Sequence, residues 1–174
     1  MTFEMVGLSG MHAALLAGMH RICFAEPWGE KAMADLLAMP GAYGFLALPQ
    51  SGKGHPPEGD KSPEGGGSKH LPLGFILCRT AGDEAEVLTF LVLPPFRRCG
   101  VATKLLDRAM EMARLAGAIA IFLEVAADND GARHLYSSRG FEQVGCRPRY
   151  YGNAIDALVM KRALPIGAEG VTPS

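Results

Sequence analysis

The sequence predicts a single α/β domain in which antiparallel hairpins are followed by a parallel crossover. Short apolar or alternating runs, typical of strands, are interspersed with segments whose apolar residues recur every three or four positions, as in helices. The early strands follow one another in hairpin order. Around Pro95 a strand at 86–93 is followed by a long helix and then by a strand at 119–125, which predicts one strand–helix–strand crossover between parallel strands.

The composition is that of an ordinary globular protein. The 174 residues are enough for one domain, and 48% of them are apolar. The formal net charge is -1, so the overall charge does not favour binding to nucleic acid or to a membrane surface. The four cysteines form no CxxC pair, which argues against a disulfide framework or a zinc site and favours a reducing, cytoplasmic compartment. We find no signal-peptide pattern and no membrane-spanning run, and therefore expect no membrane association.

The chain begins with a predicted strand at residues 2–6, followed by a helix that Ser9 can cap. In this helix four apolar residues fall on one face at steps of three and four: Met11, Leu15, Met19 and Ile22. A second helix covers about residues 29–39 and is stopped by a Pro-Gly pair. Residues 42–48 then predict the second strand.

An insertion rich in Gly, Pro and Ser occupies residues 49–70. It contains almost no apolar residues, so it cannot bury enough surface to offset its ordering entropy, and we expect a flexible segment within a domain that spans residues 1–164. Strands are predicted on its far side at 71–79 and 86–93, the second ended by two prolines. We expect residues 165–174 to form a C-terminal tail.

The second half of the chain opens with the clearest helical pattern. Its apolar stripe consists of Val101, Leu105, Ala109, Met112 and Ala116, and Gly117 is placed to end it. A buried-looking strand at 119–125 follows, then a short helix capped by Asp128 or Asn129 and ended by Gly140. Two final strands are expected at 141–147 and 154–162.

The stretch "FRRCGVATKLL" (residues 96–106) lies between a predicted strand and the long helix. A helix N-terminus presents unpaired backbone N–H groups and the positive end of a dipole, and Gly100 permits close approach of a ligand. Arg97, Arg98 and Lys104 add positive charge. The turn is therefore a candidate phosphate site, although a solvated turn with two exposed arginines explains it equally well in isolation.

Two sequence motifs strengthen the interpretation of this turn as a phosphate site. The pattern [QR]-x-x-G-x-[GA] is matched by Arg97, Gly100 and Ala102, and the pattern N-x-x-A-x-x-L-Y-x-x-x-G-F by Asn129, Ala132, Leu135, Tyr136, Gly140 and Phe141. Together they resemble the GCN5-related N-acetyltransferase (GNAT) family. With "EPWGEKAM", "LEVAADN" and "RPRYY", the sequence is most similar to the bacterial enzymes of this family that acetylate the N-terminal alanine of a ribosomal protein.

The resemblance implies the GNAT fold, a mixed twisted sheet of about six to seven strands with about four helices, splayed between its fourth and fifth strands. It also implies acetyl-CoA as the acetyl donor, with no metal. The residues expected to bind the cofactor are Phe90, Leu91, Val92, Arg98, Cys99, Gly100, Val101, Ala102, Thr103 and Asn129. Glu124 is expected to be the general base that deprotonates the amine, and Tyr136 the general acid for the departing thiolate.

The acceptor is expected to be the N-terminal α-amine of a ribosomal protein. Trp28, Tyr150 and Tyr151 are expected to line the site that binds it. Thr89 stands where the ribosomal-protein enzymes have Asn, and the loop at 151–156 is shorter than theirs, so acceptor specificity can differ. Two alternatives remain: acetylation of a small-molecule amine or a lysine, and a non-enzymatic CoA-binding sensor. We expect a monomer or weak dimer that does not bind nucleic acid directly.

Overall fold

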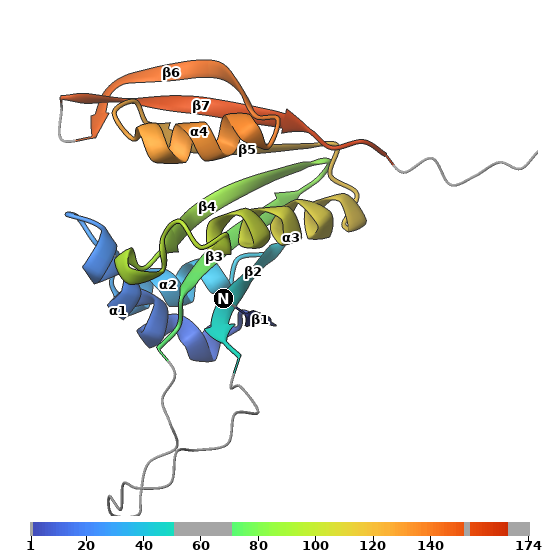
Figure 1. Ribbon diagram of the computed structural model, residues 1–174. Coiled ribbons are helices and arrows are strands. Elements are labelled where there is room, and N and C mark those ends of the chain that lie inside the picture. Colours follow the sequence, from blue (N-terminus) through green and yellow to red (C-terminus); the bar gives the residue numbers. More distant parts are fainter. Residues whose placement is uncertain (1, 51–70, 152–153, 167–174) are drawn as a thin grey trace, which may run out of the picture.

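The computed structural model describes residues 2–50, 71–151 and 154–166. These residues form a 7-stranded sheet in the order β1-β2-β3-β4-β5-β7-β6, with four α-helices packed on it (Figure 1). The predicted α/β class is therefore confirmed. Most of the predicted insertion (51–70), the loop residues 152–153 and the tail from 167 onward lie outside the described residues.

Every predicted strand and helix is present, with boundaries shifted by a few residues. The strands are β1 (Phe3–Gly7), β2 (Ala42–Pro49), β3 (Gly74–Ala81), β4 (Glu84–Val92), β5 (Ala120–Ala126), β6 (Glu142–Tyr151) and β7 (Ile155–Ala163). The helices are α1 (Ala13–Cys23), α2 (Glu30–Leu37), α3 (Val101–Leu115) and α4 (Asp130–Ser138), with 3₁₀ helices at Gly10–His12 and Pro94–Phe96. β6 extends beyond its predicted end because it pairs with β7 as far as Tyr151.

Strands β4 and β5 are parallel and are joined by α3, as the crossover pattern predicts, whereas the other neighbouring strands are antiparallel. The β4–β5 ladder consists of three residue pairs and ends at Glu86–Phe122. Beyond that point β4 continues to Val92, while β5 stays paired with β7 up to Ala126. The two strands therefore diverge (Figure 1), and the β5-facing edge of the second half of β4 has no strand partner in the described sheet.

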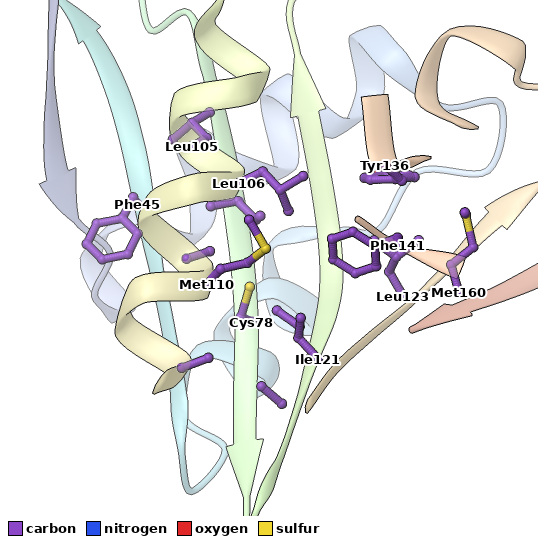
Figure 2. Close-up of a cluster of buried hydrophobic side chains, with 14 of the residues drawn as sticks. Phe45, Cys78, Leu105, Leu106, Met110, Ile121, Leu123, Tyr136, Phe141 and Met160 are labelled. Carbon is purple, nitrogen blue, oxygen red and sulfur yellow. The ribbon is translucent and has the colours of Figure 1, made fainter. Parts of the chain in front are cut away.

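Two apolar clusters hold the layers together. One lies between the sheet and helices α3 and α4; Figure 2 shows Leu105, Leu106 and Met110 of α3 in one part of it and Tyr136 beside Phe141 in the other. The second cluster lies on the opposite face, where α1 and α2 cover β2, β3 and β4 around the fully buried Phe75. The second half of β4 thus has a helix layer on each side.

The apolar face predicted for the first helical segment is wrong. Met11, Leu15 and Ile22 are 87%, 39% and 64% exposed, and of the four predicted residues Met19 alone is buried. The residues of α1 that are buried are Ala13, Leu16, Ala17, Met19 and His20. Because this helix is apolar around most of its circumference, periodicity could not select the face that the sheet covers.

Candidate active site

The turn before α3 is shaped by local backbone geometry. A 3₁₀ helix at Pro94–Phe96 ends β4, and two residues then take positive φ, Arg98 at 62° and Gly100 at 80°. The side chain of Arg97 folds back, so that its Nε donates a hydrogen bond of 3.0 Å to the Val92 carbonyl. Arg97 therefore anchors the turn to the end of β4, a role that the sequence did not reveal.

The N-terminus of α3 is left uncapped by side chains. Gly100 is its N-cap and can supply no capping oxygen, and the first turn contains no acidic residue. The Lys104 N–H already bonds to the Gly100 carbonyl at 3.2 Å, so the N–H groups before it are those that a helix cannot satisfy internally. Together with the positive end of the helix dipole, such N–H groups are suited to donate hydrogen bonds to an anion. The six predicted turn residues meet there: Arg98, Cys99, Gly100, Val101, Ala102 and Thr103.

The end of β4 lies beside this turn. Phe90, Leu91 and Val92 belong to the half of β4 that has left β5, so their backbone edge on that side is open to a ligand that pairs like a strand. Just before them the register with β3 shifts, because Leu77 is opposite Thr89 while Cys78 is opposite Val87. The resulting bulge at Leu88 changes which side chains face each helix layer, and bulges of this kind are frequent next to active sites.

Tyr136 lies on α4, across the divergence from β4. Its ring is 7% exposed and contacts Phe90 of β4 (ring centroids 6.4 Å apart) and Phe141 (5.8 Å). Of the two predicted caps, Asp128 and Asn129, it is Asn129 that caps the helix: its side chain accepts the Ala132 N–H at 3.1 Å. Tyr136 is thereby held at the point where β4 and β5 separate (Figure 2).

Glu124 projects from β5 on the face opposite to its neighbours Leu123 and Val125, which belong to the core under α3 and α4. Tyr136 belongs to that core, so the two predicted catalytic residues lie on opposite faces of β5. The Glu124 side chain is 29% exposed, and its Oε1 forms an ion pair of 3.0 Å with Nη2 of Arg147 on β6. Sequence reasoning missed Arg147, although it stands within the quoted "RPRYY".

The three predicted acceptor residues come from separate parts of the chain. Trp28, in the α1–α2 connection, is 40% exposed and stacks on His20 with ring centroids 5.1 Å apart. Tyr150 is 54% exposed, and Arg147 lies over its ring at 5.7 Å. Tyr151 ends β6, and its side chain lies outside the described residues.

His20 is a second residue that sequence reasoning did not single out. It is 3% exposed, stacks against Phe24 at 4.0 Å, and its Nδ1 accepts the backbone N–H of Trp28 at 3.0 Å. That bond requires an unprotonated Nδ1, and burial lowers the pKa of His20 below its ordinary value of 6.5. A neutral His20 thus fixes the α1–α2 connection that carries Trp28.

Lowering the pH from about 7.5 to about 5.5, the range in which histidine titrates, should reduce the free energy of unfolding of the wild-type protein. The same change of pH should reduce that of the His20→Asn variant less. In the unfolded chain His20 takes up a proton near its ordinary pKa of 6.5, whereas the folded state resists protonation, so stability falls as the pH drops through that value. Asparagine can still accept the Trp28 N–H but does not titrate. Urea unfolding at both pH values measures the difference.

The control for this prediction is His12→Asn, at a less buried histidine whose Nδ1 also accepts a backbone N–H, from Ser9 at 3.0 Å. An identical pH dependence for wild type and His20→Asn would contradict the assignment.

A cavity of about 550 Å³ lies between α4 and strands β6 and β7, but none of the predicted site residues lines it. Among the described residues no group of three or more His, Cys, Asp or Glu side chains is arranged to hold a metal ion. Nor does that part of the chain contain a helix with the length and hydropathy needed to cross a bilayer.

Comparison with known proteins identifies the class to which this fold and site belong. Residues 15–141 match the acetyltransferase (GNAT) family. The chain superposes on the crystal structure of the ribosomal-protein-S18-alanine N-acetyltransferase from Escherichia coli with a TM-score of 0.78 at 22% identity, covering 98% of this chain and 99% of that one. It also matches Arabidopsis thaliana NAA60 in complex with acetyl-CoA, with a TM-score of 0.72 at 18% identity, over 94% of this chain and 99% of that one. These two likenesses establish the fold.

The chain belongs to the GNAT family of acetyltransferases. In sequence it is 34% identical over 145 residues to the [ribosomal protein bS18]-alanine N-acetyltransferase of Escherichia coli K12, an alignment that covers 82% of this chain and 83% of the relative. Three other curated relatives match over shorter stretches, in which the chain covers 23%, 62% and 53% of their lengths.

Proposed function

We propose that the protein transfers the acetyl group of acetyl-CoA to the N-terminal α-amine of a protein, with the N-terminal alanine of a ribosomal protein as the acceptor. The observation that carries the reaction type is the early end of the β4–β5 ladder beside the uncapped N-terminus of α3. The choice of acceptor is supported by the 34% identity, over 82% of the chain, to an enzyme named for that substrate.

The residues present fit the donor. The pyrophosphate of acetyl-CoA would accept hydrogen bonds from the turn between Arg98 and Thr103. Apart from the residues next to Gly100 in the chain, nothing lies within 4 Å of the position that a Cβ on Gly100 would take. The open edge of β4 at Phe90–Val92 would pair with the pantetheine arm, as the amide groups of that arm can substitute for a strand. Asn129 would contact the cofactor through the part of its amide that does not cap α4.

The chemistry is assigned to two residues on the two faces of β5. Acetyl-CoA supplies an activated thioester, and the amine must lose a proton as its nitrogen forms the new C–N bond. Glu124 accepts that proton, directly or through a water molecule, and Tyr136 donates one to the sulfur as the C–S bond breaks. Both residues border the divergence of β4 and β5, so each can reach a group held between the strands from its own side.

The acceptor peptide is assigned to the face of the sheet that carries Glu124. Thr89, which is 7% exposed, and the exposed rings of Trp28 and Tyr150 are its candidate contacts, together with Tyr151. Aromatic side chains of this kind can pack against a peptide while leaving its terminal amine free to approach the base.

The test is acetyl transfer to synthetic peptides, followed by mass spectrometry. An Ala-starting ribosomal peptide is compared with Met-, Ser- and Gly-starting peptides, with polyamines, and with the same Ala peptide blocked at its α-amine but carrying a lysine. Rapid modification of the free α-amine of the Ala peptide is expected. Reaction of polyamines or lysine alone would retain the acetyltransferase and reject the acceptor, whereas cofactor binding without transfer would favour a sensor.

Gly100→Ala should weaken acetyl-CoA binding while leaving kcat at saturation nearly unchanged. Gly100 has a φ of 80°, where a residue with a Cβ is strained by roughly 1–2 kcal/mol. If the turn relaxes to relieve that strain, its N–H groups lose their alignment and affinity falls about tenfold, since about 1.4 kcal/mol is a factor of ten. Calorimetric titration with acetyl-CoA measures the change.

Gly82→Ala is the matched control for this variant. Gly82 has a φ of 62° in the β3–β4 turn and equally open surroundings, so the strain is similar but lies away from the site. Equal loss of affinity in both variants would contradict the assignment of the α3 turn.

A further inference from the structure

Arg147 contacts the carboxylate that the proposed mechanism uses as a base. It stands on β6, opposite Ala157 of β7, whereas Glu124 stands on β5, opposite Val159 of β7. The Arg147 side chain therefore reaches across β7 to place its Nη2 3.0 Å from the Glu124 Oε1.

Stability is a poor explanation for this ion pair. The side chains of Arg147 and Glu124 are 59% and 29% exposed, and ion pairs between exposed groups contribute little to folding because water and salt screen them and both side chains lose entropy. The pair fixes the orientation of a carboxylate instead, since one of its two oxygens is held by a guanidinium.

The same guanidinium also contacts the end of the β6–β7 hairpin. It lies 5.7 Å from the centre of the Tyr150 ring, and Tyr150 is a proposed acceptor contact. The register with β7 shifts between Arg147 and Tyr151, and the backbone N–H of Arg149, which has a φ of 53°, donates to Asp156 Oδ1 at 2.8 Å. Arg147 is thus the side chain that joins this irregular hairpin end to Glu124.

We infer that Arg147 is a positioning residue for the acetyl-transfer reaction: it orients the Glu124 carboxylate so that its second oxygen accepts the amine proton, and it ties that orientation to the hairpin that carries Tyr150. The inference rests on the proposed function. Arg147 acts through Glu124 and does not itself exchange a proton, because arginine remains protonated in proteins.

The first experiment compares Arg147→Gln with Arg149→Gln, using acetyl-CoA and the Ala-starting ribosomal peptide. Both variants remove one positive charge from the same strand, but only Arg147 contacts Glu124. Arg147→Gln should lower kcat on the order of tenfold with KM for the peptide within about twofold, since a misplaced catalytic group costs up to about 10²-fold. Arg149→Gln should leave kcat unchanged, and Arg147→Lys should recover part of the loss.

A double-mutant cycle with Glu124→Gln separates positioning from a general structural role. If Arg147 acts through Glu124, adding Arg147→Gln to the Glu124→Gln variant should cause no further loss of kcat. An equal loss in both backgrounds, a rise in KM without a fall in kcat, or an unchanged kcat in Arg147→Gln would each overturn the inference. Thermal unfolding of every variant confirms that folded protein is compared.

Failure of the inference can be told apart from failure of the proposed function. If the wild-type protein acetylates no peptide, the proposed function fails. If Glu124→Gln alone loses activity while Arg147→Gln keeps it, the base assignment stands and the role of Arg147 is rejected.

Discussion

Tyr136→Phe is expected to lower kcat by about 10²-fold or more, the usual contribution of a general acid, while acetyl-CoA binds within about twofold of its wild-type affinity. The substitution removes one oxygen and keeps the ring that packs between Phe90 and Phe141, at centroid distances of 6.4 Å and 5.8 Å. The turn before α3 and the β4 edge, to which cofactor binding is assigned, keep all their residues in this variant. A proton donor is lost from the reaction, but no packing contact is lost from the site.

Single-turnover acetylation of the Ala-starting peptide measures the chemical step, and calorimetric titration measures cofactor affinity. Tyr43→Phe is the matched control, because the Tyr43 hydroxyl donates to the Ala109 carbonyl at 3.0 Å between β2 and α3, away from the site. It should reduce stability by about 1 kcal/mol, the net worth of a hydrogen bond, with kcat unchanged. A wild-type rate in Tyr136→Phe would remove that residue from the acid role.

Glu124→Gln is expected to lower kcat/KM at neutral pH by about 10²-fold, as the loss of a general base does. Glutamine has the same shape and can still accept a hydrogen bond from Arg147, so the ion-pair geometry changes little. It cannot take the amine proton. Because the α-amine has a pKa of about 7.7–8.0, raising the pH to about 9 supplies the neutral nucleophile from solution and should restore much of the lost rate.

The pH profiles of kcat/KM for wild type and Glu124→Gln test this rescue. Glu86→Gln is the control. Glu86 is an exposed carboxylate on β4, and it pairs with Phe122, which precedes Glu124 by two residues on β5. It should leave the profile unchanged. A constant ratio between wild type and Glu124→Gln across the pH range would point to binding of the acceptor, not proton removal.

The order and type of the elements could be predicted from the sequence because each depends on local spacing. The proline pair after β4, the Gly100 turn and the Asn129 cap act on their immediate neighbours, and the structure has all three in the expected geometry. The crossover followed from the order strand, helix, strand. The motifs around Gly100 and Tyr136 resembled the GNAT family for the same reason, and residues 15–141 match it.

The spacing of apolar residues did not predict the buried face of the first helix, because more than one face of that helix is apolar. The first helical segment carries apolar residues on two faces, and the sheet covers the one containing Leu16 while Met11 and Ile22 stay exposed. Which face is covered depends on the apolar side chains that β3 and β4 present, such as Phe75 and Leu91. No pattern within the helix contains that information.

The sequence by itself therefore determined the class of fold, the turn at Gly100 and the cap at Asn129, because turns, caps and side-chain types are properties of short segments. It also singled out Glu124 and Tyr136, whose catalytic roles stay predictions. The tertiary structure alone decided the length of the β4–β5 ladder, the bulge at Leu88 and the pairing of Glu124 with Arg147. Each of these is a contact between segments that are distant along the chain. Such contacts depend on which strands pair and in which register, and this is settled when the whole sheet forms. The distances between the site residues are therefore set by the packing of the complete domain.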